Sequence, residues 1–131
     1  MLEASGLMVF YENMLALNNV NIYCGENQIV GVFGANSAGK STLMYTLSGI
    51  IEDIRKKKEM AGGERVNILG EIQYLGQDIT GLKPSQRAKK GIVLCPERRR
   101  IFKECNVMEN LRIGGYLASS SQAKNTMDYI F

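Results

Sequence analysis

A short glycine-containing stretch carries the residue types that hold a nucleotide triphosphate. It follows the spacing G-x-x-x-x-G-K-[ST] and consists of Gly34, Ala35, Asn36, Ser37, Ala38, Gly39, Lys40, Ser41 and Thr42. The glycines let backbone N–H groups approach phosphate oxygens, and a helix beginning near Gly39 would direct its positive dipole end at the same anion. Lys40 can reach the β- and γ-phosphates, and the Ser41 hydroxyl can ligate Mg²⁺. The pattern therefore predicts a site for ATP or GTP, with residues 34–42 as its phosphate loop.

The flanking segments give this motif the strand-to-helix setting that it requires. The run at 28–33 is largely apolar toward both faces, which predicts a buried strand in the middle of a mainly parallel sheet. After the loop, Leu43, Leu47 and Ile50 recur at helical spacing, and Gly49 lies where that helix is expected to end.

Alternation and turn signals predict the other elements. Short strands are expected at residues 7–10, 20–23, 66–69, 71–75 and 92–95. Helices are predicted to begin at Pro84, at a capping box formed by Asn106 and Glu109, and at the serines 119–121. The charged segment 51–65 is interpreted as an exposed excursion.

Length and composition narrow the class of protein. The chain has 131 residues, 45% hydrophobic and 22% charged, which predicts one soluble globular domain. No run approaches the roughly 20 apolar residues of a membrane span, so we expect no membrane insertion. Three cysteines that never form a C-x-x-C pattern indicate neither a disulfide framework nor a zinc site. The lack of histidine excludes a His-dependent triad within these residues.

Positive charge is concentrated in two short runs. The net charge is +3, and cations gather at residues 55–58 and 98–100. Glu52, Asp53 and Glu59 partly neutralise the first run, and no aromatic residue alternates with the cations to stack bases. A solvated surface is therefore favoured over a nucleic-acid-binding patch.

Segments on both sides of the phosphate loop match one known family in order and spacing. The matching residues are 9–17, 76–82, 87–92, 95–102 and 107–112. With the phosphate loop, they resemble the ATP-binding subunits of ABC transporters, and most closely the ATPases of branched-chain amino acid importers. The resemblance covers nearly the whole chain but only the first half of the family's domain.

This resemblance implies a fold and a set of site residues. The fold is the N-terminal part of an α/β P-loop NTPase domain of the ABC type. It comprises an antiparallel β subdomain, the phosphate-loop strand and helix, and the start of a helical subdomain. Residues 1–95 would form the nucleotide-binding core, and residues 96–131 the coupling loop and helical part. Tyr11 would stack on the adenine ring, while Glu97 would occupy the coupling-loop position and join Ser41 near Mg²⁺ or the attacking water.

The resemblance also implies a function and its partners. The chain would be part of an ATPase subunit that couples ATP hydrolysis to the import of branched-chain or similar amino acids, with ATP and Mg²⁺ as cofactors. Its partners would be a transmembrane permease and a second ATP-binding subunit or the missing C-terminal half, with no direct nucleic acid. This arrangement implies a cytoplasmic location, peripheral at the inner face of the cell membrane through the permease.

Some residues depart from the family pattern. Ser37 stands where the family nearly always has glycine, so a positive φ there would strain the loop. The segment 51–65 is longer than the usual connection, and Cys105 and Asn106 replace the usual small hydrophobic residue and threonine.

The largest departure is that Phe131 precedes the family's signature motif, Walker B strand, D-loop and switch histidine. We therefore expect this chain to bind ATP but hardly hydrolyse it, because family hydrolysis needs an acid beside Mg²⁺ and a second subunit's signature loop. We also expect the strand at 28–33 to lack cover, which would leave the chain marginally stable, oligomeric or dependent on another polypeptide.

Two other functions remain open. A self-contained small P-loop phosphotransferase would use Glu97 or Asp78 as its acid and the arginines at 98–100 as a phosphoryl clamp. A nucleotide-responsive regulatory fragment would use both basic runs to bind nucleic acid. Proline between the apolar residues 92–95 and Glu97 favours the coupling-loop role of that acid over a catalytic one.

Overall fold

The computed structural model describes residues 1–63, 65–97 and 101–130. The chain divides into two compact units, Met1–Leu94 and Cys95–Phe131. The predicted boundary at residues 95–96 lies beside this division, and the roles assigned to the two parts stay predictions. The basic run at 98–100 and the terminal Phe131 lie outside the described residues.

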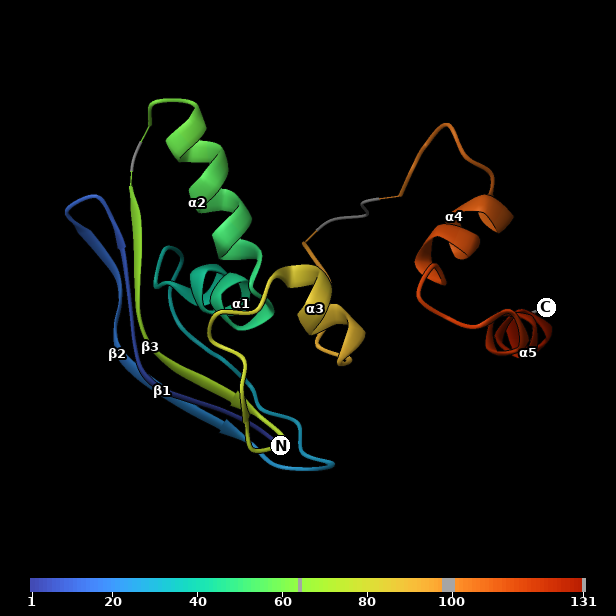
Figure 1. The fold of residues 1–131 in the computed structure, drawn as a ribbon, viewed down its shortest axis with the longest axis horizontal. Helices are drawn as coiled ribbons and strands as arrows, with labels where there is room; N and C mark the ends of the chain where they lie inside the picture. Colours follow the sequence, from blue (N-terminus) through green and yellow to red (C-terminus); the bar gives the residue numbers. More distant parts are fainter. Residues whose placement is uncertain (64, 98–100, 131) are drawn as a thin grey trace. The chain divides into compact units, whose positions relative to one another are not determined.

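The first unit is built on a four-stranded antiparallel sheet with the strand order β2-β1-β3-β4 (Figure 1). The strands are β1 (Leu2–Tyr11), β2 (Met14–Cys24), β3 (Val66–Tyr74) and β4 (Gln77–Asp78). The predicted strands at 7–10 and 20–23 are confirmed, although both extend further. This sheet agrees with the antiparallel subdomain that the family resemblance implies.

The sequence predicts two strands separated by Gly70, but this glycine lies inside the single strand β3. Its φ is 103°, and a Cβ at this position would lie 2.6 Å from the Gly6 carbonyl oxygen. The pairing of β1 with β3 shifts register between Ser5 and Met8, opposite this glycine. Gly70 thus permits close backbone contact at an irregular part of the sheet, which keeps β3 continuous.

Helices α1 (Lys40–Ser48) and α2 (Ile50–Met60) lie against one face of the sheet (Figure 1). The core joins residues of β1, β2, β3 and both helices, with one further side chain, that of Ile79, from the turn after β4. It consists of Ala4, Leu7, Val9, Leu17, Leu43, Leu47, Ile51, Val66, Ile72 and Ile79. The prediction that α1 ends near Gly49 is confirmed, since Gly49 caps it with a φ of 81°. This core fixes the helix that follows the phosphate loop.

The segment 51–65, interpreted as an exposed excursion, is largely exposed but forms the helix α2 over most of its length, which the sequence did not predict. Ile51 is buried in the core, whereas the other residues of the helix, Ile54 and Met60 among them, are partly covered or exposed. Acidic residues occupy its first turn and lysines its last, which suits the helix dipole. Glu52 also pairs with Arg55 at 2.6 Å. Charge placement and the buried Ile51 therefore stabilise this helix.

Residues 28–33 do not form the predicted buried strand of a parallel sheet. Ile29 is 100% exposed and Phe33 is 94% exposed, and no strand of the described residues pairs with this segment. The predicted strand at 92–95 is likewise absent from the described structure. A strand needs a hydrogen-bonded neighbour as well as apolar residues. The expected dependence on another polypeptide stays a prediction.

The two remaining helices that the sequence predicted after residue 100 are confirmed in the second unit. They are α4 (Val107–Gly114) and α5 (Ser120–Ile130), and neither has a buried residue. The capping box at the start of α4 is present: Glu109 N–H donates to the Asn106 side chain at 2.9 Å, and Asn106 N–H donates to the Glu109 carboxylate at 2.8 Å. Within the described residues, no helix is long and apolar enough to cross a membrane.

Candidate nucleotide-binding site

Gly39 joins the phosphate loop to α1 and cannot carry a side chain without displacing its neighbours. It is the N-cap of α1, in the left-handed region with a φ of 87°. A Cβ here would lie 2.5 Å from the Ala16 carbonyl oxygen and 3.0 Å from a methyl carbon of Leu17. The loop therefore meets β2 at a point where only glycine fits both the backbone angle and the available space.

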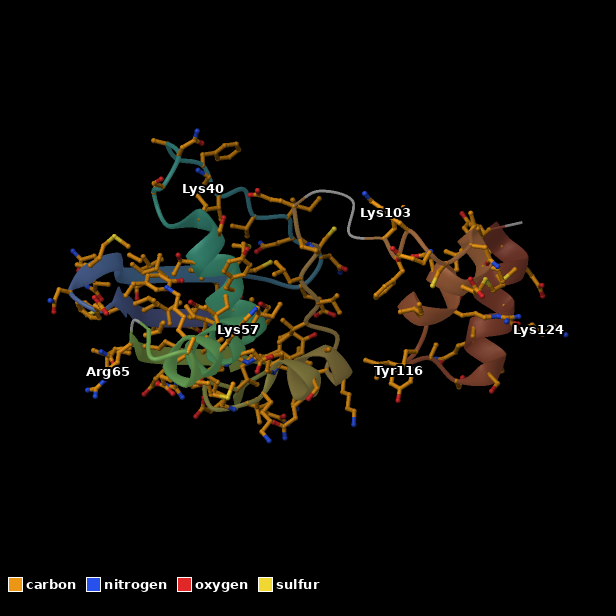
Figure 2. The ribbon with its side chains drawn as sticks, turned by 90° about the horizontal axis from the view of Figure 1, so that it is seen from above. Lys40, Lys57, Arg65, Lys103, Tyr116 and Lys124 are labelled. Atoms are coloured by element: carbon orange, nitrogen blue, oxygen red, sulfur yellow. The ribbon has the colours of Figure 1, made fainter. Side chains whose placement is uncertain are left out.

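The Lys40 side chain folds back over the phosphate loop. Its Nζ donates to the carbonyl oxygens of Gly34 at 2.7 Å and Ala35 at 2.6 Å. Figure 2 labels Lys40 at the junction of the loop and α1. An ammonium group has three protons, so two bonds to the loop leave one for a phosphate oxygen. The same lysine can thus brace the loop and present a positive charge to an anion.

The start of α1 supplies further groups that suit a metal-bound triphosphate. The first N–H groups of a helix lack intrahelical acceptors and carry its positive dipole end. Ser41 lies in this first turn and is exposed, and its hydroxyl makes no hydrogen bond to any described residue. A free hydroxyl oxygen is a ligand that Mg²⁺ accepts. The residues present therefore fit a phosphate and its magnesium ion.

Ser37 adopts the strained conformation that its departure from glycine predicted. Its φ is 65°, a region that a non-glycine residue occupies at a cost of about 1 kcal/mol. We expect Ser37→Gly to relieve this strain and to raise the free energy of unfolding by up to about 1 kcal/mol, measured by urea unfolding.

The control for this substitution is Ser37→Ala, which keeps the Cβ that makes a positive φ costly at this position. It should leave the free energy of unfolding within about 0.5 kcal/mol of the parent value. Equal stabilities of Ser37→Gly and Ser37→Ala would mean that the backbone at residue 37 is not strained.

Tyr11 and Glu97 lie in different units, and their predicted roles stay predictions. Tyr11 ends β1 and is half-buried, where it packs against the core. The Lys58 Nζ, from α2, lies 5.0 Å from the centre of its ring. Glu97 is exposed in the second unit.

Asp78, the other acid considered for catalysis, is engaged in a turn. Its carboxylate accepts the Thr80 N–H at 2.8 Å. Hydrogen bonding from Thr80 lowers the pKa of Asp78 below its ordinary value of 3.8. This carboxylate therefore stays ionised at neutral pH and serves the turn after β4, which gives the phosphotransferase alternative no support.

The sequence did not identify Arg87 as a site-supporting residue, although its hydrogen bonds hold the end of α1. It lies on α3 (Pro84–Lys89), the helix predicted to begin at Pro84, and is only 2% exposed. Its guanidinium donates to the carbonyl oxygens of Thr46 and Leu47 at 2.8 Å, of Thr80 at 2.8 Å and of Leu82 at 3.1 Å. Two of these acceptors lie in the last turn of the helix that carries Lys40.

Burial lowers the pKa of Arg87, while Glu52 and Asp78 act in the opposite direction. Nothing in the short helix 84–89 distinguishes this cation from its exposed neighbours, because its partners are up to 41 residues away in the sequence. Arginine suits this buried position because its planar guanidinium group can donate hydrogen bonds to several carbonyl oxygens at once.

Comparison with known proteins identifies the family to which this chain belongs. The family described as ABC transporter matches residues 17–130. The high-affinity branched-chain amino acid transport ATP-binding protein BraG of Pseudomonas aeruginosa is 33% identical over 130 residues, which are 99% of this chain and 50% of that protein. The high-affinity branched-chain amino acid transport ATP-binding protein LivG of Escherichia coli is 32% identical over 113 residues, 86% of this chain and 39% of that protein.

A relative with another task also matches. The lipopolysaccharide export system ATP-binding protein LptB of Haemophilus influenzae is 31% identical over 110 residues, 84% of this chain and 40% of that protein. The chain spans half or less of the length of these curated relatives. The phosphate loop at the start of α1, the antiparallel sheet and the match over residues 17–130 agree with one another, and the chain belongs to the ABC transporter family, with the P-loop NTPase fold.

Proposed function

We propose that this chain is the N-terminal portion of an ATP-binding subunit that drives the import of branched-chain or similar amino acids. The observation that carries the nucleotide part is the Lys40 ammonium, held by the Gly34 and Ala35 carbonyls at the start of α1. Residues 34–42 would cradle the phosphates, Ser41 would ligate Mg²⁺ and Tyr11 would stack on the adenine ring. Bound Mg²⁺ would neutralise charge on the phosphates.

The solute and the partners are proposed from the names of the relatives. BraG and LivG are named for branched-chain amino acid transport, whereas LptB is named for lipopolysaccharide export. The higher identity and coverage of BraG favour an amino acid as the solute. Residues 95–131 would then contribute the coupling loop, with Glu97, and part of the helical subdomain that contacts a membrane permease. A second ATP-binding subunit, or the C-terminal half of the domain, would complete the catalytic site at the cytoplasmic face of the membrane.

Calorimetric titration of the purified chain with Mg·ATP tests the nucleotide-binding part of this proposal. Saturable binding at one site per chain is expected, with Mg·AMP binding at least about 10-fold more weakly because it lacks the β- and γ-phosphates. A chain that releases no heat with Mg·ATP and shows no binding by equilibrium dialysis would contradict the proposal.

We expect the 131-residue polypeptide to release phosphate from Mg·ATP at well below about 1 per second. In the family mechanism, an acid beside Mg²⁺ positions the attacking water, and a second subunit's signature loop closes over the γ-phosphate. The phosphate loop of this chain supplies neither group. Steady-state phosphate release measures the rate, with the Lys40→Ala variant as background. A Lys40-dependent rate of about 1 per second or more would show that this polypeptide has its own catalytic acid.

A further inference from the structure

The ring of Tyr11 is in contact with a cation from a helix that the sequence did not predict. The Lys58 Nζ lies 5.0 Å from the ring centre, within the distance of a cation–π interaction. Lys58 belongs to the last turn of α2 and is half-buried.

A nucleotide base and the Lys58 ammonium need the same space above the ring. Stacked aromatic rings place their centres about 4.5–7 Å apart, and the ammonium already lies at 5.0 Å. The Tyr11 side chain also packs against the hydrophobic core, which covers part of its remaining surface. A base that stacks on the ring surface beneath Lys58 must therefore displace the ammonium first.

We propose that Lys58 is a specificity-determining residue of the nucleotide site, because its ammonium occupies the surface of Tyr11 on which a base would stack. This inference rests on the proposed function. Displacing Lys58 offsets part of the stacking energy, so the triphosphate group dominates recognition and the base contributes little. The chain should consequently discriminate weakly between ATP and inorganic tripolyphosphate.

The test compares Lys58→Gln with Lys57→Gln in calorimetric titrations. Lys57, labelled in Figure 2, is the exposed neighbour on α2, so both variants lose one positive charge from the same turn. Each variant is titrated with Mg·ATP and with Mg·tripolyphosphate, which has no base. Relative to Lys57→Gln, we expect Lys58→Gln to bind Mg·ATP about 2- to 5-fold more tightly and Mg·tripolyphosphate equally well.

Two further variants separate competition for the ring from other effects. In a Tyr11→Leu background, the advantage of Lys58→Gln for Mg·ATP should disappear, because the ring for which the two groups compete is gone. Lys58→Ala should also bind Mg·ATP more tightly, which would show that the gain does not come from a new contact of the glutamine side chain. Circular dichroism at 222 nm establishes that each variant retains its helices.

The inference is overturned if Lys58→Gln binds Mg·ATP no more tightly than Lys57→Gln, or if tripolyphosphate gains the same factor. Either result would coexist with intact nucleotide binding by the parent chain, so the proposed function would stand. If the parent chain bound neither Mg·ATP nor Mg·tripolyphosphate, both the proposed function and this inference would be refuted.

Discussion

Lys40→Ala is expected to weaken Mg·ATP binding by about 100-fold or more. The ammonium is positioned by two loop carbonyls and has a proton left for the phosphates. Hydrogen bonds to charged groups contribute about 1.5–3 kcal/mol each, and the substitution removes such bonds both to the phosphates and within the loop. A loss of about 3 kcal/mol corresponds to roughly 100-fold in the dissociation constant. Calorimetric titration measures this change directly.

Lys57→Ala is the matched control for the loss of one positive charge. Lys57 is exposed on α2 and makes no contact with the phosphate loop among the described residues, so its removal should change the dissociation constant by less than about 2-fold. The Lys40→Ala variant should retain the parent's free energy of unfolding, measured by urea unfolding, to within about 1 kcal/mol, because the Lys40 side chain is not part of the core. If both variants bound Mg·ATP alike, residues 34–42 would not form the nucleotide site.

Arg87→Met is expected to lower the free energy of unfolding by about 3 kcal/mol. Methionine fills a similar volume but leaves the carbonyl oxygens of Thr46 and Leu47 without their guanidinium donor. Part of the loss is offset, since a buried charge no longer has to be desolvated, which is the cost that the lowered pKa of Arg87 reflects. Urea unfolding followed by circular dichroism at 222 nm measures the difference.

Two other substitutions identify the cause of the Arg87 effect. Lys89→Met removes an exposed cation from the same helix and should change the free energy of unfolding by less than about 0.5 kcal/mol. Arg87→Lys keeps a charge but lacks the planar fork, so its stability should fall between those of the parent and Arg87→Met. Equal midpoints for Arg87→Met and Lys89→Met would mean that the hydrogen bonds to α1 contribute nothing measurable.

The fastening of α1 by Arg87 also bears on nucleotide binding. The first turn of α1 carries Lys40 and Ser41, while its last turn is held by Arg87 from α3. A loosened C-terminal end would allow α1 to shift in the core and would disturb the close contact of Gly39 with Ala16. The stability of the site thus depends on Arg87, a residue far from the phosphate loop in the sequence.

Residues that act on near neighbours in the chain were predictable from the sequence. The phosphate loop is contiguous, so its spacing identified Gly39 and Lys40, whereas the resemblance to the family led to the expectation of a strained Ser37. The capping box of Asn106 and Glu109 forms between residues three apart, and its two hydrogen bonds are present. The roles of Tyr11, Ser41 and Glu97 toward a nucleotide and its metal stay predictions, because they depend on groups outside the polypeptide.

Only the tertiary structure decided the features that depend on distant partners. Apolar residues at 28–33 predicted a strand, yet no neighbouring strand among the described residues pairs with them. The buried Arg87 guanidinium donates a hydrogen bond to Thr46, and the Lys58 ammonium lies over the Tyr11 ring. Each contact joins residues more than 40 positions apart in the sequence. The sequence by itself determined the local chemistry of the phosphate loop, because neighbouring residues impose their geometry through short-range bonds. Contacts between distant segments depend on how the whole chain packs, and no local spacing encodes that packing.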